Sequence, residues 1–135
     1  MVGQVEIWKP VPSIDGLEAS SHGRVRCIRY AQIMPHGGHR IRSFGPSAGC
    51  VSYGAKGSMH KRMIFRFRGK TYKVHRAVCE AFHGVALFDR AVVMHVDENS
   101  FNNNPENLRW GTQKENLNAP LFRALRCASA QRRAA

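Results

Sequence analysis

Residues that could support hydrolytic chemistry gather in one stretch of the chain. This stretch contains His95, Asp97, Asn107 and Asn116. A neutral imidazole can take a proton from water near pH 7. A hard cation such as Mg²⁺ prefers oxygen ligands, including the carbonyl of an amide, and commonly uses few protein ligands. The stretch therefore combines a candidate proton acceptor with candidate ligands for a divalent cation.

Four short elements must position these side chains. Residues 91–96 are typical of a short apolar strand, 97–106 of a polar loop, 108–110 of a second strand that pairs back, and 113–118 of a helix. Side chains alternate along the first strand, so Met94 lies on the face opposite to that of His95, which favours a core position for Met94. Asp97 can hydrogen-bond the loop amides or the imidazole, or serve only to shape the loop.

A hairpin and a helix are predicted just before this unit. Residues 63–74 form the hairpin, with Gly69-Lys70 as its two-residue turn. That register pairs Phe67 with Tyr72 and Phe65 with Val74, so one face is apolar and the other is basic. The apolar residues at positions 74, 77, 78, 81 and 82 have the spacing of an amphipathic helix that ends at Gly84.

The first sixty residues indicate short strands and loops. Residues 4–30 contain short strands separated by turns, and the run from Arg24 to Tyr30 predicts a basic strand rather than a core strand. Residues 35–61 are rich in Gly, Pro, Ser and His, which predicts loops with one or two weak strands.

Positive charge is unevenly distributed along the chain. The net charge is +12, and residues 22–79 contain thirteen of the 21 Lys and Arg residues but no Asp or Glu. A surface that is merely solvated usually mixes both signs. The sequence has no long apolar run for a membrane, so nucleic acid is the expected partner.

The cysteines and the N-terminus indicate a reducing compartment. Four cysteines lie far apart without a Cys-x-x-Cys spacing, so we expect buried, reduced thiols. The N-terminus lacks the charged and apolar segments of a secretion signal.

The segment from His95 to Asn116 resembles the HNH endonucleases of phages and mobile introns. It has the form H-x-D-x-N, then N-N-x-x-E-N-L-x-W, then T-x-x-E-N. Residues 74–82 are similar to the V-H-R-x-V-x-x-A-F helix that precedes this motif in such enzymes. Residues 6–26 resemble the nuclease-associated modular domain that often precedes phage HNH motifs.

The resemblance implies roles for individual residues. His95 would be the general base, Asn107 would brace the site, and Asn116 would bind the catalytic divalent ion, with Asp97 as a further site residue. The ion would be Mg²⁺, with Mn²⁺ as an alternative, in a one-metal hydrolysis of phosphodiester bonds. The substrate would be double-stranded DNA, and the enzyme would be phage-encoded and act in the host cytoplasm. Met94 departs from the pattern, because many members have an Asp or His ligand there.

The expected fold class is α+β, with small antiparallel strands and a hairpin followed by a ββα-metal (HNH) motif and a C-terminal helix. Residues 1–60 form a DNA-contacting segment, 61–118 the HNH nuclease domain, and 119–135 a basic C-terminal helix or tail. The predicted DNA-binding residues are Arg24, Arg26, Arg66, Arg68, Lys73, His75 and Arg76.

Two other functions are compatible with the sequence. One is a DNA-binding protein that keeps the HNH fold without useful catalysis, which Met94 would favour. The other is a phage protein that binds a host nucleic-acid-processing complex through its basic surface. RNA is a weaker alternative to DNA because no aromatic RNA-recognition motif is visible.

Overall fold

The computed structural model describes residues 5–53, 61–120, 124 and 127. Within them, all paired strands are antiparallel and the fold combines small sheets with helices, which confirms the α+β class. The chain order is β1 (Trp8–Pro10), β2 (Glu18–Ser20), β3 (Val25–Ile33), β4 (His39–Ser47), β5 (Cys50–Ser52), β6 (Arg62–Phe67), β7 (Lys70–Lys73), α1 (Val74–His83), β8 (Val92–His95), the 3-10 helix η1 (Pro105–Asn107), β9 (Leu108–Gly111) and α2 (Gln113–Leu117).

Strands β1 to β4 form one sheet in chain order. The first half of β3 belongs to the core, since Val25 and Cys27 point inward and are 0% and 1% exposed. The prediction of a basic strand from Arg24 to Tyr30 is therefore wrong for this half. The inward alternation of Val25 and Cys27 outweighs the charge of Arg26 between them, whose side chain turns to the other face.

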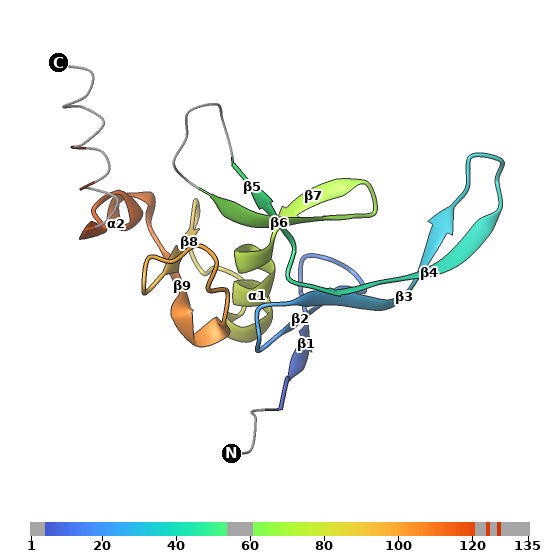
Figure 1. Ribbon diagram of the computed structural model, residues 1–135, viewed down its shortest axis with the longest axis horizontal. Helices are drawn as coiled ribbons and strands as arrows, with labels where there is room; N and C mark the ends of the chain where they lie inside the picture. Colours follow the sequence, from blue (N-terminus) through green and yellow to red (C-terminus); the bar gives the residue numbers. More distant parts are fainter. Residues whose placement is uncertain (1–4, 54–60, 121–123, 125–126, 128–135) are drawn as a thin grey trace.

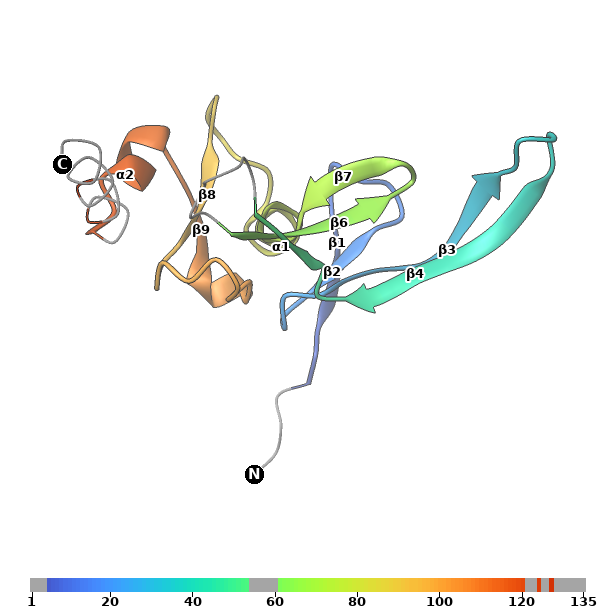
Figure 2. The ribbon, with the colours of Figure 1, turned by 45° about the horizontal axis from the view of Figure 1, so that its top comes forward.

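The outer part of β3 and β4 projects from the body of the protein, as Figures 1 and 2 both show. We call residues 28–44 the β3–β4 arm. Its side chains Ile28, Ile33 and Ile41 are 66%, 75% and 54% exposed. Residues 35–61, predicted as loops with one or two weak strands, contain the nine-residue strand β4 and the short strand β5, so the prediction underestimated the length of β4. Backbone pairing holds this arm, and a strand that buries few side chains leaves a weak hydrophobic pattern in the sequence.

The predicted hairpin is present as β6 and β7, but its register is wrong by two residues. Phe65 lies opposite Tyr72, and Phe67 opposite Lys70. The turn is formed by Arg68 and Gly69, both with positive φ, as in a type I′ turn. A shift of two residues keeps the side chains of the paired strands on their predicted faces, because side chains alternate with a period of two, but it moves Arg68 from the strand into the turn.

Helix α1 packs at the centre of the molecule and confirms the predicted amphipathic helix (Figure 1). Its buried face joins residues of the N-terminal sheet and of β6 in one core. This core therefore contains residues from both sides of the predicted boundary at residue 60. The buried residues of this cluster are Val11, Ile14, Leu17, Ala19, Val25, Cys27, Phe65, Phe67, Val74, Ala77, Val78, Cys79 and Leu108, and Ala91 and Met94 are buried outside it.

Strands β8 and β9 and helix α2 form the predicted strand, loop, strand, helix unit. β8 and β9 pair with His95 opposite Leu108. Thr112 and Glu115 form a capping box at the start of α2, which fixes the direction of this short helix. The helix then contacts β8, the strand that carries His95.

The four cysteines are free, as expected, but only Cys27 and Cys79 are buried. Cys50 and Cys127 are exposed, so the prediction of buried thiols is wrong for these two. Most of the predicted C-terminal helix lies outside the described residues. Among the helices of the described ranges, none has the length and apolar character needed to cross a membrane.

Candidate active site

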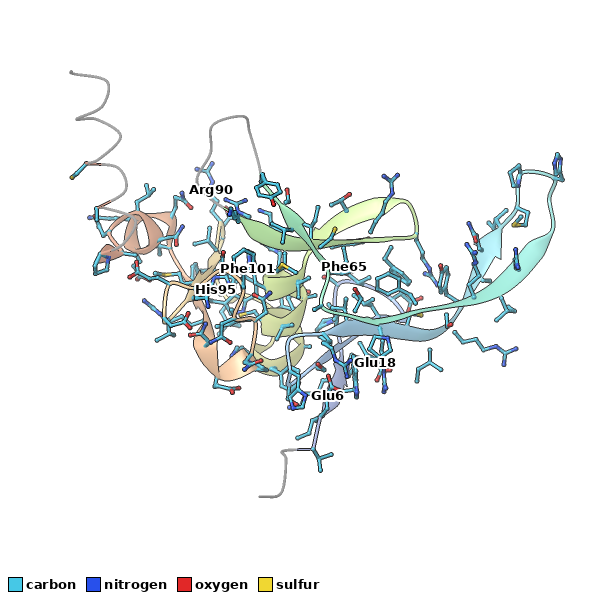
Figure 3. All side chains as sticks on the ribbon, viewed as in Figure 1. Glu6, Glu18, Phe65, Arg90, His95 and Phe101 are labelled. Carbon is cyan, nitrogen blue, oxygen red and sulfur yellow. The ribbon has the colours of Figure 1, made fainter. Side chains whose placement is uncertain are left out.

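His95 ends strand β8, with its half-buried imidazole in contact with two side chains. Its Nε2 lies 2.9 Å from Oδ1 of Asn103. The ring of His75, from the first turn of α1, meets it edge to face at a centroid distance of 5.3 Å. Figure 3 shows His95 on the side of the molecule formed by β8, β9 and α2, away from the β3–β4 arm. These contacts fix the imidazole from two directions.

The loop after His95 is held by a network around Asn107. The Asn107 side chain is 8% exposed; its Oδ1 accepts from the Asp97 backbone N–H at 3.0 Å. Its Nδ2 donates to Asp97 Oδ1 at 2.8 Å and to the Asn102 carbonyl at 2.9 Å. Asn107 thus braces the loop, which is the kind of role that the sequence resemblance implied for it.

Asp97 directs its hydrogen bonds into this loop. Its carboxylate accepts from the side chain of Asn102 at 2.9 Å and from the backbone of Asn99 at 2.8 Å. These bonds, together with that from Asn107, hold the pKa of Asp97 below its usual value, so the group stays ionised. Of the alternatives open for Asp97, the structure shows the bonds to loop amides, whereas the imidazole of His95 is bonded by Asn103.

Asn116 lies in α2, which contacts the strand of His95. Its side chain is half-buried and forms no hydrogen bond with another described residue. The amide oxygen is therefore available to a cation. The described residues contain no group of three His, Cys, Asp or Glu side chains that could hold a metal ion. This donor set fits a Mg²⁺ ion held by one or two protein ligands plus water and a substrate phosphate.

Met94 occupies a core position, as strand alternation predicted. It is 8% exposed, and its Sδ lies so close to β9 that a Cβ added to Gly111 would be 2.4 Å away. A thioether is also a poor ligand for Mg²⁺. Met94 therefore supports the strand pair rather than the cation.

Comparison with known proteins identifies this unit. Residues 72–118 match the family model described as HNH endonuclease. The chain carries an HNH endonuclease domain. This confirms the resemblance inferred from the sequence motif.

Full-length comparison extends the similarity beyond the HNH domain. DNA endonuclease I-HmuI of Bacillus phage SP01 is 32% identical over 123 residues, which cover 86% of this chain and 58% of the relative. An uncharacterized HNH endonuclease, L245 of Acanthamoeba polyphaga mimivirus, is 28% identical over 120 residues, covering 88% of this chain and 31% of the relative. The chain thus spans between about a third and three fifths of the curated relatives it matches.

A solved structure shows a similar fold. That structure is described as one of DNA binding and cleavage by the HNH homing endonuclease I-HmuI. The match has a TM-score of 0.50 and 28% identity, and it covers 87% of this chain and 59% of that chain. The similarity therefore includes the N-terminal sheet as well as the HNH domain.

His75 of the HNH domain lies beside His95. Burial, reinforced by the charges of His95, Lys73, Arg62 and Arg76, lowers the pKa of His75 to about 3. The ring is therefore neutral at physiological pH. Arg76 is exposed at the next position and lies over the ring of Trp110, 5.4 Å from its centroid.

The predicted DNA-binding arginines fall into two environments. Arg24 forms two hydrogen bonds to Glu6, and Arg26 lies 3.2 Å from Glu18 and 4.0 Å from the centroid of the Trp8 ring. Any phosphate contact by these two residues would compete with those partners. Their role in DNA binding stays a prediction.

Among the described residues, none forms an ion pair with the basic face of the β6–β7 hairpin. Arg66 and Lys73 are exposed on the face opposite Phe65 and Phe67. Arg68 instead lies in the turn, where its guanidinium packs over the ring of Tyr30, 5.6 Å from the centroid. The structure thus keeps Arg66 and Lys73 on one outward face and removes Arg68 from it.

Two features were missed by sequence reasoning. Asn103, the hydrogen-bond partner of His95, stands in a run of three asparagines that indicates only turn positions. The exposed arginines of the β3–β4 arm, Arg29, Arg40 and Arg42, were missed because the sequence did not predict that the two strands pair and project as an arm. Only the excess of positive charge in this region pointed to them.

Proposed function

We propose that this protein is a metal-dependent DNA endonuclease that hydrolyses phosphodiester bonds at the site around His95. The observation that carries this proposal is the position of His95 within an HNH domain. Its imidazole is held through Nε2 beside a helix that offers the unbonded amide of Asn116. A held imidazole and a free amide oxygen are the groups that metal-assisted hydrolysis of a phosphodiester requires.

In the proposed reaction, His95 takes a proton from the water molecule that attacks phosphorus. A new P–O bond forms to the water oxygen while the bond to the 3′ oxygen breaks, and the leaving oxygen is protonated from solvent. Asn116 would hold the divalent ion, most readily Mg²⁺ and alternatively Mn²⁺, which supplies charge stabilisation at the phosphate when bound. Asn107 and Asp97 keep the loop after His95 in place.

The proposed substrate is double-stranded DNA, acted on in the cytoplasm of a phage host. The relative I-HmuI is named as a DNA endonuclease, and the solved structure is described as binding and cleaving DNA. The outward face with Arg66 and Lys73 and the projecting β3–β4 arm give this chain basic surfaces for phosphate groups. A two-stranded ribbon such as the arm also has dimensions that a DNA groove admits.

A DNA-binding protein without useful catalysis is the second candidate, which the burial of Met94 favours. Supercoiled plasmid incubated with Mg²⁺, Mn²⁺ or EDTA distinguishes the two. Our proposal expects cleavage with either ion and none with EDTA. Binding without cleavage under all three conditions would support the second candidate.

The metal ligand is tested by Asn116→Ala, with Asn118→Ala as a control at the exposed end of the same helix. We expect Asn116→Ala to need more Mg²⁺ for half-maximal cleavage, because it removes the half-buried amide oxygen that we assign to the ion. Asn118→Ala should keep the wild-type metal curve. A wild-type curve for Asn116→Ala would mean that another residue holds the ion.

A further inference from the structure

The hydrogen bond between His95 and Asn103 determines which nitrogen of the imidazole carries a proton. The atom of Asn103 that faces Nε2 is the carbonyl oxygen Oδ1, at 2.9 Å. A carbonyl oxygen only accepts hydrogen bonds, so Nε2 must be the donor. In a neutral imidazole the other nitrogen, Nδ1, then has the lone pair that can take a proton from water.

Asn103 is suited to hold this arrangement because it is fixed on two sides. It is 5% exposed in the folded chain. The turn between β2 and β3 packs against its backbone, where a Cβ added to Gly23 would lie 3.0 Å from the carbonyl carbon of Asn103. The acceptor for His95 is therefore anchored to the N-terminal sheet as well as to its own loop.

The neighbouring polar residues are engaged elsewhere. Asp97 accepts from Asn99, Asn102 and Asn107, and Asn107 bonds Asp97 and Asn102. His75 contacts the imidazole through its ring, edge to face. Among the described residues, Asn103 is thus the side chain whose hydrogen bond selects the tautomer of His95.

We propose that Asn103 is the positioning residue of the site, which holds His95 with the proton on Nε2 and leaves Nδ1 as the base. The catalytic consequence rests on the proposed nuclease function. The tautomer itself is a property of the free protein, so it can be measured whether or not the protein cleaves DNA.

The first test is nitrogen-15 NMR of the histidine rings in the metal-free, DNA-free protein at a pH where His95 is neutral. The His95 signals are assigned by their loss in His95→Gln. We expect the Nε2–H tautomer in the wild type and a mixture of both tautomers in Asn103→Leu, which removes the acceptor while keeping a similar volume. A wild-type ring protonated on Nδ1, or an unchanged tautomer in Asn103→Leu, would overturn the proposal.

The second test compares Asn103→Asp with Asn104→Asp, which adds the same charge one residue away. Asp can still accept from Nε2 and adds a negative charge that favours the imidazolium. Among the described residues, His75 and Asp97 interact electrostatically with His95, and both are unchanged in the two variants. We expect the acid limb of the pH–rate profile to move to higher pH by about one unit or more in Asn103→Asp. The shift of the acid limb should be clearly smaller in Asn104→Asp.

Asn103→Leu should lower the cleavage rate by about tenfold to a hundredfold, the usual effect of removing the partner of a functional histidine, with unchanged DNA affinity. Equal pH profiles for the two Asp variants, or full activity in Asn103→Leu, would contradict a positioning role. If the wild type cleaves no DNA, the proposed function fails, and the NMR result alone decides whether Asn103 positions His95.

Discussion

At the scale of single residues, the site depends on which neighbours each polar group has. Asp97 and Asn107 were expected at the site from the motif; their hydrogen bonds shape the loop after His95, and their part in catalysis stays a prediction. The residue bonded to His95 is Asn103, which the sequence did not separate from Asn102 and Asn104. Three consecutive asparagines have the same turn preference, and only tertiary packing decides which of them points inward.

His75 gives a prediction about stability and pH. Its pKa falls from the ordinary 6.5 to about 3 in the folded chain, chiefly because of burial. Below about pH 6.5 the unfolded chain therefore binds a proton that the folded chain does not bind until about pH 3, so stability is lost as the pH falls through this window. Urea unfolding at pH 7 and pH 4.5 should show a smaller loss in His75→Gln than in the wild type.

His36→Gln is the matched control, since His36 is exposed near the tip of the β3–β4 arm. It should lose as much stability between the two pH values as the wild type does. An identical loss in His75→Gln and in the wild type would show that His75 titrates freely.

At the scale of elements, periodic burial explains what could be predicted. Helix α1 and the β8–β9 pair have clear apolar periodicity and were predicted closely. The β6–β7 register was wrong because Gly69 suits either position of a two-residue turn, and Arg68 takes the first with φ 50°. The length of strand β4 could not be predicted, because its side chains are mostly exposed and their alternation has no buried face.

The β6–β7 face predicts the salt dependence of DNA binding. Each phosphate contact contributes about 0.9 to the slope of log affinity against log salt. If Arg66 and Lys73 both contact phosphates, the double variant Arg66→Ala with Lys73→Ala should lower that slope by between about one and two units. Fluorescence anisotropy with a short duplex over a salt series measures the slope.

The variant Arg24→Ala with Arg26→Ala removes the same amount of charge from residues already paired with Glu6 and Glu18. The salt slope of this variant should fall by less than half of the decrease expected for Arg66→Ala with Lys73→Ala. Circular dichroism checks that both variants are folded. The reverse order of effects would place DNA on β3 instead of on the hairpin.

At the scale of the whole molecule, β8, β9 and α2 lie at the opposite end from the β3–β4 arm (Figure 2). The acidic residues of the second half of the chain lie in or beside the HNH domain, whereas the arm has none. The core between the two ends contains residues of the N-terminal sheet, of β6 and of α1. If the arm contacts nucleic acid as we propose, that contact lies apart from the proposed site of chemistry, and the packed core connects the two.

The arm can be removed as a test of this division. Replacing residues 31–41 with Asn-Gly joins Tyr30 to Arg42, which already lie opposite each other, through a favoured two-residue turn. Because Ile33 and Ile41 are exposed, we expect the melting temperature to fall by no more than about 4 °C, equivalent to about 1 kcal/mol. Affinity for duplex DNA should fall at least severalfold. Unchanged affinity would show that the arm does not contact DNA.

The central claim is that His95 performs the chemistry of a DNA endonuclease, and the most direct measurement is plasmid cleavage by His95→Ala. The wild type and the variant are purified identically and compared in single-turnover reactions with Mg²⁺, and duplex binding is measured in parallel. We predict that the variant cleaves at least about a hundredfold more slowly with unchanged binding, because loss of a general base affects the transition state and leaves phosphate contacts intact. Wild-type cleavage by His95→Ala, in preparations free of contaminating nuclease, would contradict the account.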